Sequence, residues 1–220
     1  MPPEVSGPAA LADILPVSRE TADRLAAFVR LVEKWQKVEN LIASGTVSDI
    51  WRRHVADSAQ LVPLLPTASR WLDLGSGAGF PGLVVAILVA GRPGAAVHLV
   101  ESNSRKCSFL RTVARETGAP AVVHQGRITD VLAGWNEPID AITARALAPL
   151  PELLRMTGGL IGPGCPAFFP KGVDYRSEID EAGKSFDLDL VIHPSRVADG
   201  SVILEVRRVT RKSGGAKSRP

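Results

Sequence analysis

The sequence predicts an α/β fold with a doubly wound, mostly parallel sheet that carries helices on both faces. From Arg70 onward, short apolar segments alternate with segments of helical periodicity, which is typical of such a sheet. A glycine-rich turn follows the first apolar segment, at the kind of position where open α/β sheets bind ligands. The last two apolar segments are separated only by residues 194–200, a loop too short for a crossover helix, so they should pair antiparallel.

Composition limits the class of protein. The chain has 220 residues, of which 45% are hydrophobic and 22% charged, as in a globular domain with a small appendage. These values exclude a collagen, a coiled coil and a wholly disordered chain. The longest apolar run, residues 83–90, is far shorter than the roughly 20 residues of a membrane helix. The first basic residue is Arg19, and Cys107 and Cys165 show no disulfide or metal-ligand spacing. We therefore expect a cytoplasmic, monomeric enzyme or binding protein without a metal.

The N-terminal third is predicted to be helical. Ser18 should cap a helix that reaches about Ala43, because apolar residues recur at helical spacing. Thr46 and Asp49 resemble a capping box for a second helix, which Pro63 ends. The predicted divisions of the chain are a flexible leader at 1–16, a helical extension at 17–68, the α/β domain at 69–210 and a flexible basic tail at 211–220.

The α/β domain has alternating elements. Its expected strands are Arg70–Leu74, Ala96–Glu101, Ala121–His124, Ile139–Thr143, Ala167–Phe169, Leu188–Ile192 and Ser201–Val209. Its expected helices are Gly82–Ala90, Ser104–Thr117, a short turn at 129–133, Leu147–Met156 and 174–184.

The net charge of +3 is concentrated at the C-terminus. Residues 207–220 hold six basic side chains and no acid, so the rest of the chain has 20 basic and 23 acidic residues. A like-charged tail with Gly and Ser either keeps a protein soluble or contacts nucleic acid, and both interpretations stay open.

The glycine-rich turn is the strongest motif. The first strand should end near Asp73, and glycines follow at Gly75, Gly77 and Gly79. Glycine permits the positive φ of a tight turn and lets a ligand approach the backbone. Glu101 ends the second strand, where a carboxylate can accept hydrogen bonds from both ribose hydroxyls. The pattern indicates a site for a nucleoside-bearing cofactor.

Two cofactor classes fit this pattern. Residues 77–82 match G-x-G-x-x-G, the dinucleotide fingerprint of oxidoreductases. However, Asp73 and Gly75 come between the strand and that motif, and Pro81 removes a backbone donor that a pyrophosphate would use. An acid followed by alternating glycines favours S-adenosylmethionine, which has no phosphate, with Asp73 facing its ammonium group directly or through water.

Several motifs together resemble the bacterial 16S rRNA guanine-7 methyltransferases, also called the glucose-inhibited division protein B family. The resemblance covers roughly residues 20–210. It rests on Asp73–Gly82, Val100–Asn103, Arg105-Lys106, Phe109–Arg111, Asn40–Ile42, Arg53–Ser58, Ala144–Ala146 and Lys171-Gly172. It implies a seven-stranded class I methyltransferase fold and methylation of a guanosine in the decoding-region loop of 16S rRNA, alone or within the small ribosomal subunit.

The resemblance also implies site residues. The family's positions for the methyl donor fall on Gly75, Phe80, Ile128, Thr129 and Arg145. We expect Arg145, just after the fourth strand, to hold the donor or the target base, and it is the candidate catalytic residue. An ion pair at the strand end is the alternative for Arg145.

The expected chemistry needs few catalytic groups. N7 of guanine is an unprotonated acceptor and can attack a methyl group without losing a proton, so positioning suffices. Lys106, Lys171, Arg207 and Arg208 are candidate contacts to RNA phosphate. For His54 and Asp57, a hydrogen-bonded contact between the extension and the sheet is favoured over a catalytic dyad. A non-catalytic RNA-binding protein that keeps only the fold is a further alternative.

Overall fold

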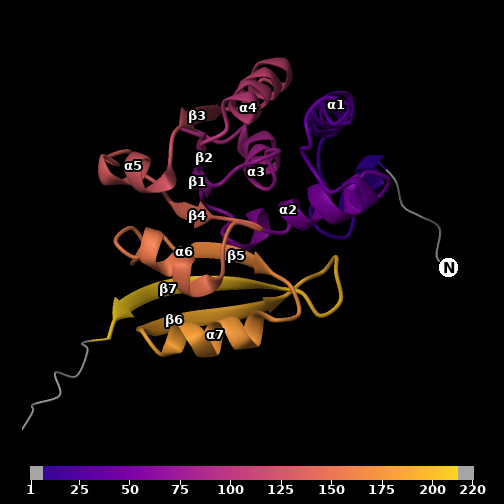
Figure 1. The fold of residues 1–220 in the computed structure, drawn as a ribbon. Coiled ribbons are helices and arrows are strands. Elements are labelled where there is room, and N and C mark those ends of the chain that lie inside the picture. The colour runs from indigo at the N-terminus through magenta and orange to yellow at the C-terminus, as the bar shows by residue number, and fades with distance from the viewer. Residues whose placement is uncertain (1–6, 213–220) are drawn as a thin grey trace, which may run out of the picture.

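The computed structural model describes residues 7–212, which form one α/β sheet with helices on both faces and a helical extension at one side (Figure 1). The strands are β1 (Arg70–Leu74), β2 (Ala96–Glu101), β3 (Ala121–Gln125), β4 (Ala141–Thr143), β5 (Ala167–Lys171), β6 (Phe186–Pro194) and β7 (Val202–Arg211). The main helices are α1 (Arg19–Trp35), α3 (Gly82–Val89), α4 (Ser104–Thr117), α5 (Ile128–Ala133), α6 (Leu150–Thr157) and α7 (Tyr175–Gly183). Shorter helical segments are η1 (Gly7–Leu11), η2 (Ser44–Thr46), the π-helix η3 (Trp51–Ala56), α2 (Asp57–Ala59) and η4 (Val62–Leu64).

The sheet has seven strands in the order β3-β2-β1-β4-β5-β7-β6. Neighbouring strands are parallel except for β7, which is antiparallel to both β5 and β6. This confirms the predicted fold class, including the antiparallel pair at the end of the chain. The order reverses at β1, so the carboxyl ends of β1 and β4 diverge into a crevice where open α/β sheets bind ligands.

Each face of the sheet packs into its own core. Side chains of β1 alternate between them: Trp71 joins the core under α1, α3 and α4, and Leu72 joins the core under α6 and α7. Helix α3 is apolar all round and almost wholly buried, because α1 and the extension cover its outer side. The extension is therefore part of the main core.

The first helix of the extension ends earlier than predicted. Ser18 caps α1 by accepting a hydrogen bond from the backbone N–H of Thr21, as expected, but the helix ends at Trp35 and not near Ala43. The side chain of Gln36 then accepts hydrogen bonds from the backbone N–H groups of Leu41 and Ile42. These contacts fold the following residues into a turn that periodicity alone does not indicate.

The predicted capping box at Thr46 and Asp49 is wrong. The Thr46 hydroxyl donates to the carbonyl of Ala43 and lies 2.9 Å from Nε2 of His54, and it caps no helix. The segment instead passes through η2 into the π-helix η3, whose first residue has no side-chain cap. Thr46 is thereby turned toward the site.

Both predicted termini also need correction. Within the predicted leader, η1 forms and the side chains of Leu11 and Ile14 are buried in the core, so residues 7–16 are not a free leader. At the other end β7 continues to Arg211, one residue into the predicted tail. Residues 1–6 and 213–220 lie outside the described part of the chain.

Two element starts shift for local reasons. Strand β4 begins at Ala141, because the Asp140 carboxylate accepts hydrogen bonds from the backbone N–H groups of Ser69 and Arg70. Helix α6 begins at Leu150, after an extended Pro149, so the residues that follow β4 remain a loop. Among residues 7–212, no helix combines the length and hydrophobicity needed to cross a bilayer.

Candidate active site

The turn between β1 and α3 depends on glycine at several points. Gly75, Gly77 and Gly79 have φ values of 65°, 52° and 87°, the left-handed region that favours glycine. A Cβ on Gly75 would also lie 2.6 Å from Cδ1 of Leu147. Gly82, at the start of α3, has no such φ but leaves no room either, since a Cβ there would lie 2.5 Å from Oδ2 of Asp73. The turn is therefore fixed by backbone conformation and by close packing together.

Asp73 lies beneath this turn. Its side chain is fully buried, and neither carboxylate oxygen has a hydrogen-bond partner among the described residues. The hydroxyl of Thr143, its register neighbour on β4, is likewise buried without a partner. Burial raises the pKa of Asp73 to about 7. The nearby Ser76 hydroxyl and the positive charge of Arg145 lower this pKa, but they offset the effect of burial only in part. Asp73 does not line the cavity described below, and neither does Gly79.

Glu101 fixes the second side of the site at the end of β2. Its Oε2 accepts a hydrogen bond of 2.9 Å from the N–H of Gly77, and Oε1 accepts one of 2.8 Å from the N–H of Asn103. The carboxylate thus joins the glycine turn to the start of α4. Each oxygen keeps a lone pair for another donor.

A cavity of about 1630 Å³ opens at the carboxyl ends of the parallel strands. It brings together most of the predicted cofactor residues, namely Gly75, Gly77, Phe80, Glu101, Ile128, Thr129 and Arg145. The extension supplies the opposite wall, with residues that include Thr46, Asp49, Arg53, His54 and Asp57. This volume exceeds the 300–1,000 Å³ of usual small-molecule pockets, so there is room for a cofactor and a second reactant.

Arg145 joins the two walls. Its Nη1 lies 3.2 Å from Oδ2 of Asp57 and donates to the carbonyl of Arg53, while Nη2 lies 2.8 Å from Nδ1 of His54. The predicted contact of His54 and Asp57 between the extension and the sheet is thus present. Arg145 does make the ion pair that was its alternative role, and it also lines the cavity.

His54 must be neutral to make this contact. Nδ1 accepts from Arg145, so the ring proton is on Nε2 and points to the hydroxyl of Thr46. Burial and the positive charges of Arg145 and Arg53 lower the pKa of His54 to about 4. The ring lies 5.0 Å from that of Phe80, and the Arg145 guanidinium lies 5.5 Å from the same ring. Phe80 is thereby held between the core and the cavity.

The predicted RNA-binding residues do not gather at one place. Lys106 lines the cavity. Lys171 also lies there, but its ammonium group forms an ion pair of 2.7 Å with Glu178 and donates a hydrogen bond to the carbonyl of Ala148. It therefore holds the loop that carries Arg145. Arg208 is exposed on β7, outside the residues that line the cavity.

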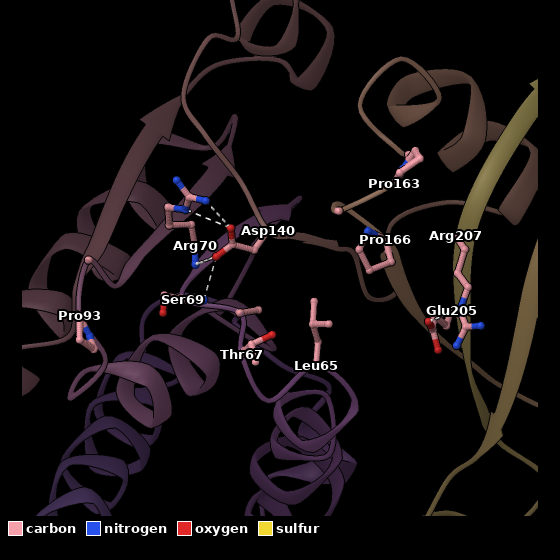
Figure 2. A pocket seen from close by; sticks show the side chains of 14 residues that line it. Leu65, Thr67, Ser69, Arg70, Pro93, Asp140, Pro163, Pro166, Glu205 and Arg207 are labelled. Carbon is pink, nitrogen blue, oxygen red and sulfur yellow. Dashed lines mark hydrogen bonds and ion pairs between the residues drawn. The ribbon is translucent and has the colours of Figure 1, made fainter.

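Arg207 lies at the other end of the strands, away from the cavity described above. It pairs with Glu205 and lines a second cavity of about 750 Å³ at the amino ends of the parallel strands (Figure 2). The Arg70–Asp140 pair faces it across this cavity (Figure 2). The antiparallel course of β7 explains the displacement, because Val206, just before Arg207, pairs with Ala167 at the start of β5.

Sequence reasoning missed several cavity residues. Arg52 and Arg53 on η3, and Arg127 just before α5, present three further cations to the cavity. The only signal for Arg53 was its place in the motif beside His54. Arg127 had none, because basic residues at a helix start are common on solvated surfaces.

The fold and the site define the class of protein. A glycine turn after β1, a carboxylate after β2 and the antiparallel β7 make this a Rossmann-like methyltransferase fold. The structure is similar to that of the O-methyltransferase TomG from Streptomyces achromogenes in complex with SAM, with a TM-score of 0.58 and 13% identity, over 90% of this chain and 93% of that one. It is also similar to the SAH-bound methyltransferase PaMTH1 of Podospora anserina, with a TM-score of 0.57 and 14% identity, over 91% and 99% of the chains. At these identities the likeness establishes the fold alone.

The chain belongs to the GidB family, rRNA small subunit methyltransferase G, whose model matches residues 21–200. The ribosomal RNA small subunit methyltransferase G of Brucella canis is 48% identical over 197 residues, 90% of this chain and 92% of that protein. The protein of the same name from Bradyrhizobium diazoefficiens is 47% identical over 190 residues, 86% of this chain and 73% of that protein. The predicted family is therefore confirmed, and the protein is a methyltransferase of small-subunit rRNA.

Proposed function

We propose that the protein transfers a methyl group from S-adenosylmethionine to N7 of a guanosine in the decoding-region loop of 16S rRNA. Family membership supports the RNA substrate. The observation that carries the proposal is the cavity shared by the glycine turn, Glu101 and Arg145, because it has room for both a donor and a base.

The residues present fit the donor. Gly75 and Gly77 allow it to approach the backbone, and Glu101 offers free lone pairs to the ribose hydroxyls. The start of α5 at Ile128 and Thr129 borders the same cavity and would contact the adenine. The unpartnered oxygens of Asp73 would attract the ammonium group, through water, since Asp73 does not reach the cavity itself. When bound, the donor supplies an electrophilic methyl group on a sulfonium.

The chain needs only to bind, orient and exclude water. N7 of guanine carries a lone pair and no proton, so no general base is required. Arg145 is held rigidly by Asp57 and His54, and a guanidinium at that point can donate to O6 of the target guanine and keep N7 turned to the donor. We therefore assign Arg145 a positioning role in the reaction.

Cations around the cavity suit an RNA backbone. Arg52, Arg53, Lys106 and Arg127 line it, and none of them forms an ion pair within residues 7–212. Their side chains come from three separate segments, namely the extension, α4 and the turn before α5. Phosphates that follow a splayed-out guanosine can be neutralised there.

The test is transfer of labelled methyl from S-adenosylmethionine to purified small ribosomal subunits and to deproteinised 16S rRNA. The product is digested to nucleosides and separated. Labelled 7-methylguanosine is expected, and the better substrate shows when in ribosome assembly the enzyme acts. Label in any other nucleoside would contradict the proposed target atom, and calorimetric binding of NAD in place of the donor would contradict the cofactor.

A further inference from the structure

The cavity is lined by five carboxylates, and three of them already have partners. Glu101 accepts from the backbone, Asp57 pairs with Arg145, and Glu178 pairs with Lys171. The other two, Asp49 and Asp199, have no ion pair and no side-chain hydrogen bond among residues 7–212. A carboxylate is only an acceptor, so each of these two is free to receive donors from a ligand.

Asp49 and Asp199 differ in how they are held. Asp199 is exposed, in the turn between β6 and β7. Asp49 is half-buried, and its backbone is fixed on both sides, since its N–H donates to the carbonyl of Thr46 and its carbonyl accepts from the N–H of Arg53. Of the two free carboxylates, only Asp49 is half-buried and has both of its backbone groups hydrogen-bonded.

The segment that carries Asp49 also contacts the Arg145 cluster. The Thr46 hydroxyl lies 2.9 Å from Nε2 of His54, and the His54 ring contacts Phe80 and Arg145. Asp49 is therefore tied to the Arg145 cluster through the backbone of Thr46, and it lines the same cavity.

Guanine has the chemistry that such a carboxylate recognises. Its Watson–Crick edge presents two adjacent donors, the ring N1–H and the exocyclic N2 amino group, and proteins read this edge in unpaired RNA bases. Adenine presents an unprotonated ring nitrogen there, which a carboxylate would repel. N7 lies on the other side of the purine, so a contact at the Watson–Crick edge leaves N7 free to face the donor.

We propose that Asp49 selects the target base by accepting hydrogen bonds from N1–H and the N2 amino group of guanine. This inference rests on the proposed function and names the residue that makes the site specific for guanosine. Arg52 and Arg53 line the same cavity, so its cations attract the approaching phosphates despite the charge of Asp49.

The test uses two 16S rRNAs prepared by ligation that carry either guanosine or inosine at the accepting position. Inosine lacks only the N2 amino group. The wild type should methylate the guanosine RNA with a kcat/KM roughly 10- to 100-fold higher, the usual worth of a hydrogen bond to a charged group. Asp49→Asn should lose most of this preference, by lowering kcat/KM for guanosine much more than for inosine, which keeps only the N1–H contact. Its affinity for S-adenosylmethionine, measured by calorimetry, should equal that of the wild type.

Asp199→Asn is the matched control, because it neutralises the other free carboxylate of the cavity and should keep the full preference. An unchanged guanosine-to-inosine ratio in Asp49→Asn, or an equal loss in Asp199→Asn, overturns the inference. Failure of the wild type to label N7 of either RNA overturns the proposed function, and the inference with it.

Discussion

The guanidinium of Arg145 donates a hydrogen bond of 2.8 Å to the imidazole of His54, a residue 91 positions earlier in the chain. The bond joins the loop after β4 to the π-helix η3 of the extension. It exists only while Nδ1 of His54 is unprotonated, and the pKa of about 4 keeps the ring neutral at physiological pH. The extension is thereby coupled to the residue on which the proposed reaction most depends.

Arg145→Ala should lower methyl transfer by about 100-fold or more, because the guanidinium that positions the target base is lost while the fold remains. The free energy of unfolding should fall by roughly 1–3 kcal/mol, since Asp57 is left without its charged partner. The double variant Asp57→Asn with Arg145→Ala should recover stability but not activity. Methyl-transfer assays and denaturant unfolding check both, and near-normal turnover of Arg145→Ala would refute the assignment.

His54→Gln tests the neutral imidazole through pH. In the unfolded chain His54 takes up a proton below about pH 6.5, while the folded protein resists protonation down to about pH 4. The His54 contribution to stability is therefore present above pH 6.5 and is lost as the pH falls toward 4. The stability difference between wild type and His54→Gln, from urea unfolding, should be larger at pH 7.5 than at pH 4.5. An equal difference at both pH values would exclude this role.

Asp73→Asn should stabilise the protein at alkaline pH and weaken donor binding. The folded pKa of about 7 lies above the unfolded value of 3.8, so the folded state retains a proton that the unfolded state releases. Asp73 therefore lowers stability progressively between about pH 4 and 7, by up to about 4 kcal/mol above pH 7. The gain from unfolding measurements should be several-fold larger at pH 8 than at pH 4.5, while calorimetry should show weaker binding of S-adenosylmethionine. Unchanged donor affinity would remove Asp73 from the proposed donor site.

Gly75→Ala should weaken donor binding, with Gly118→Ala as its matched control. Both glycines have a φ near 65°, so each alanine costs about 1 kcal/mol of backbone strain. Only at Gly75 does the new methyl group also meet another side chain, that of Leu147, whereas the space around Gly118 is open. Donor affinity should thus fall in Gly75→Ala alone, and an equal loss in both variants would show that strain, not the site, is responsible.

Lys171→Gln should change the stability of the protein, whereas Lys106→Gln should change the salt dependence of RNA binding. Lys171 is 9% exposed and paired with Glu178, so its loss should reduce stability by about 1–3 kcal/mol and leave the salt dependence of RNA binding unchanged. Lys106 forms no ion pair within residues 7–212, so its loss should leave stability unchanged and reduce the salt slope by about 1. A reduced salt slope in Lys171→Gln would restore the original expectation that this lysine contacts RNA.

Local features of the sequence were sufficient to predict the strands and the glycine turn of the α/β domain. Alternating apolar segments predicted all seven strands, and the short loop before β7 predicted its antiparallel course, because a crossover helix needs more residues. The positions of the glycine turn and Glu101 in the site could also be predicted from the sequence, since both are fixed by backbone geometry within one βαβ unit. Family membership followed from the same motifs.

The contacts between distant segments were decided only by the tertiary structure. Gln36 ends α1 by folding back on Leu41, and Thr46 turns from a predicted cap into a partner of His54, because their hydrogen-bond partners are set by packing against the sheet. Lys171 and Arg207 were chosen for their charge, and charge alone does not show that one meets a half-buried carboxylate or that the other lies at the amino ends of the parallel strands. The sequence by itself determined the strands, the glycine turn and the family; the fold decided which side chains share the cavity, since that depends on neighbours up to 145 residues apart in the chain.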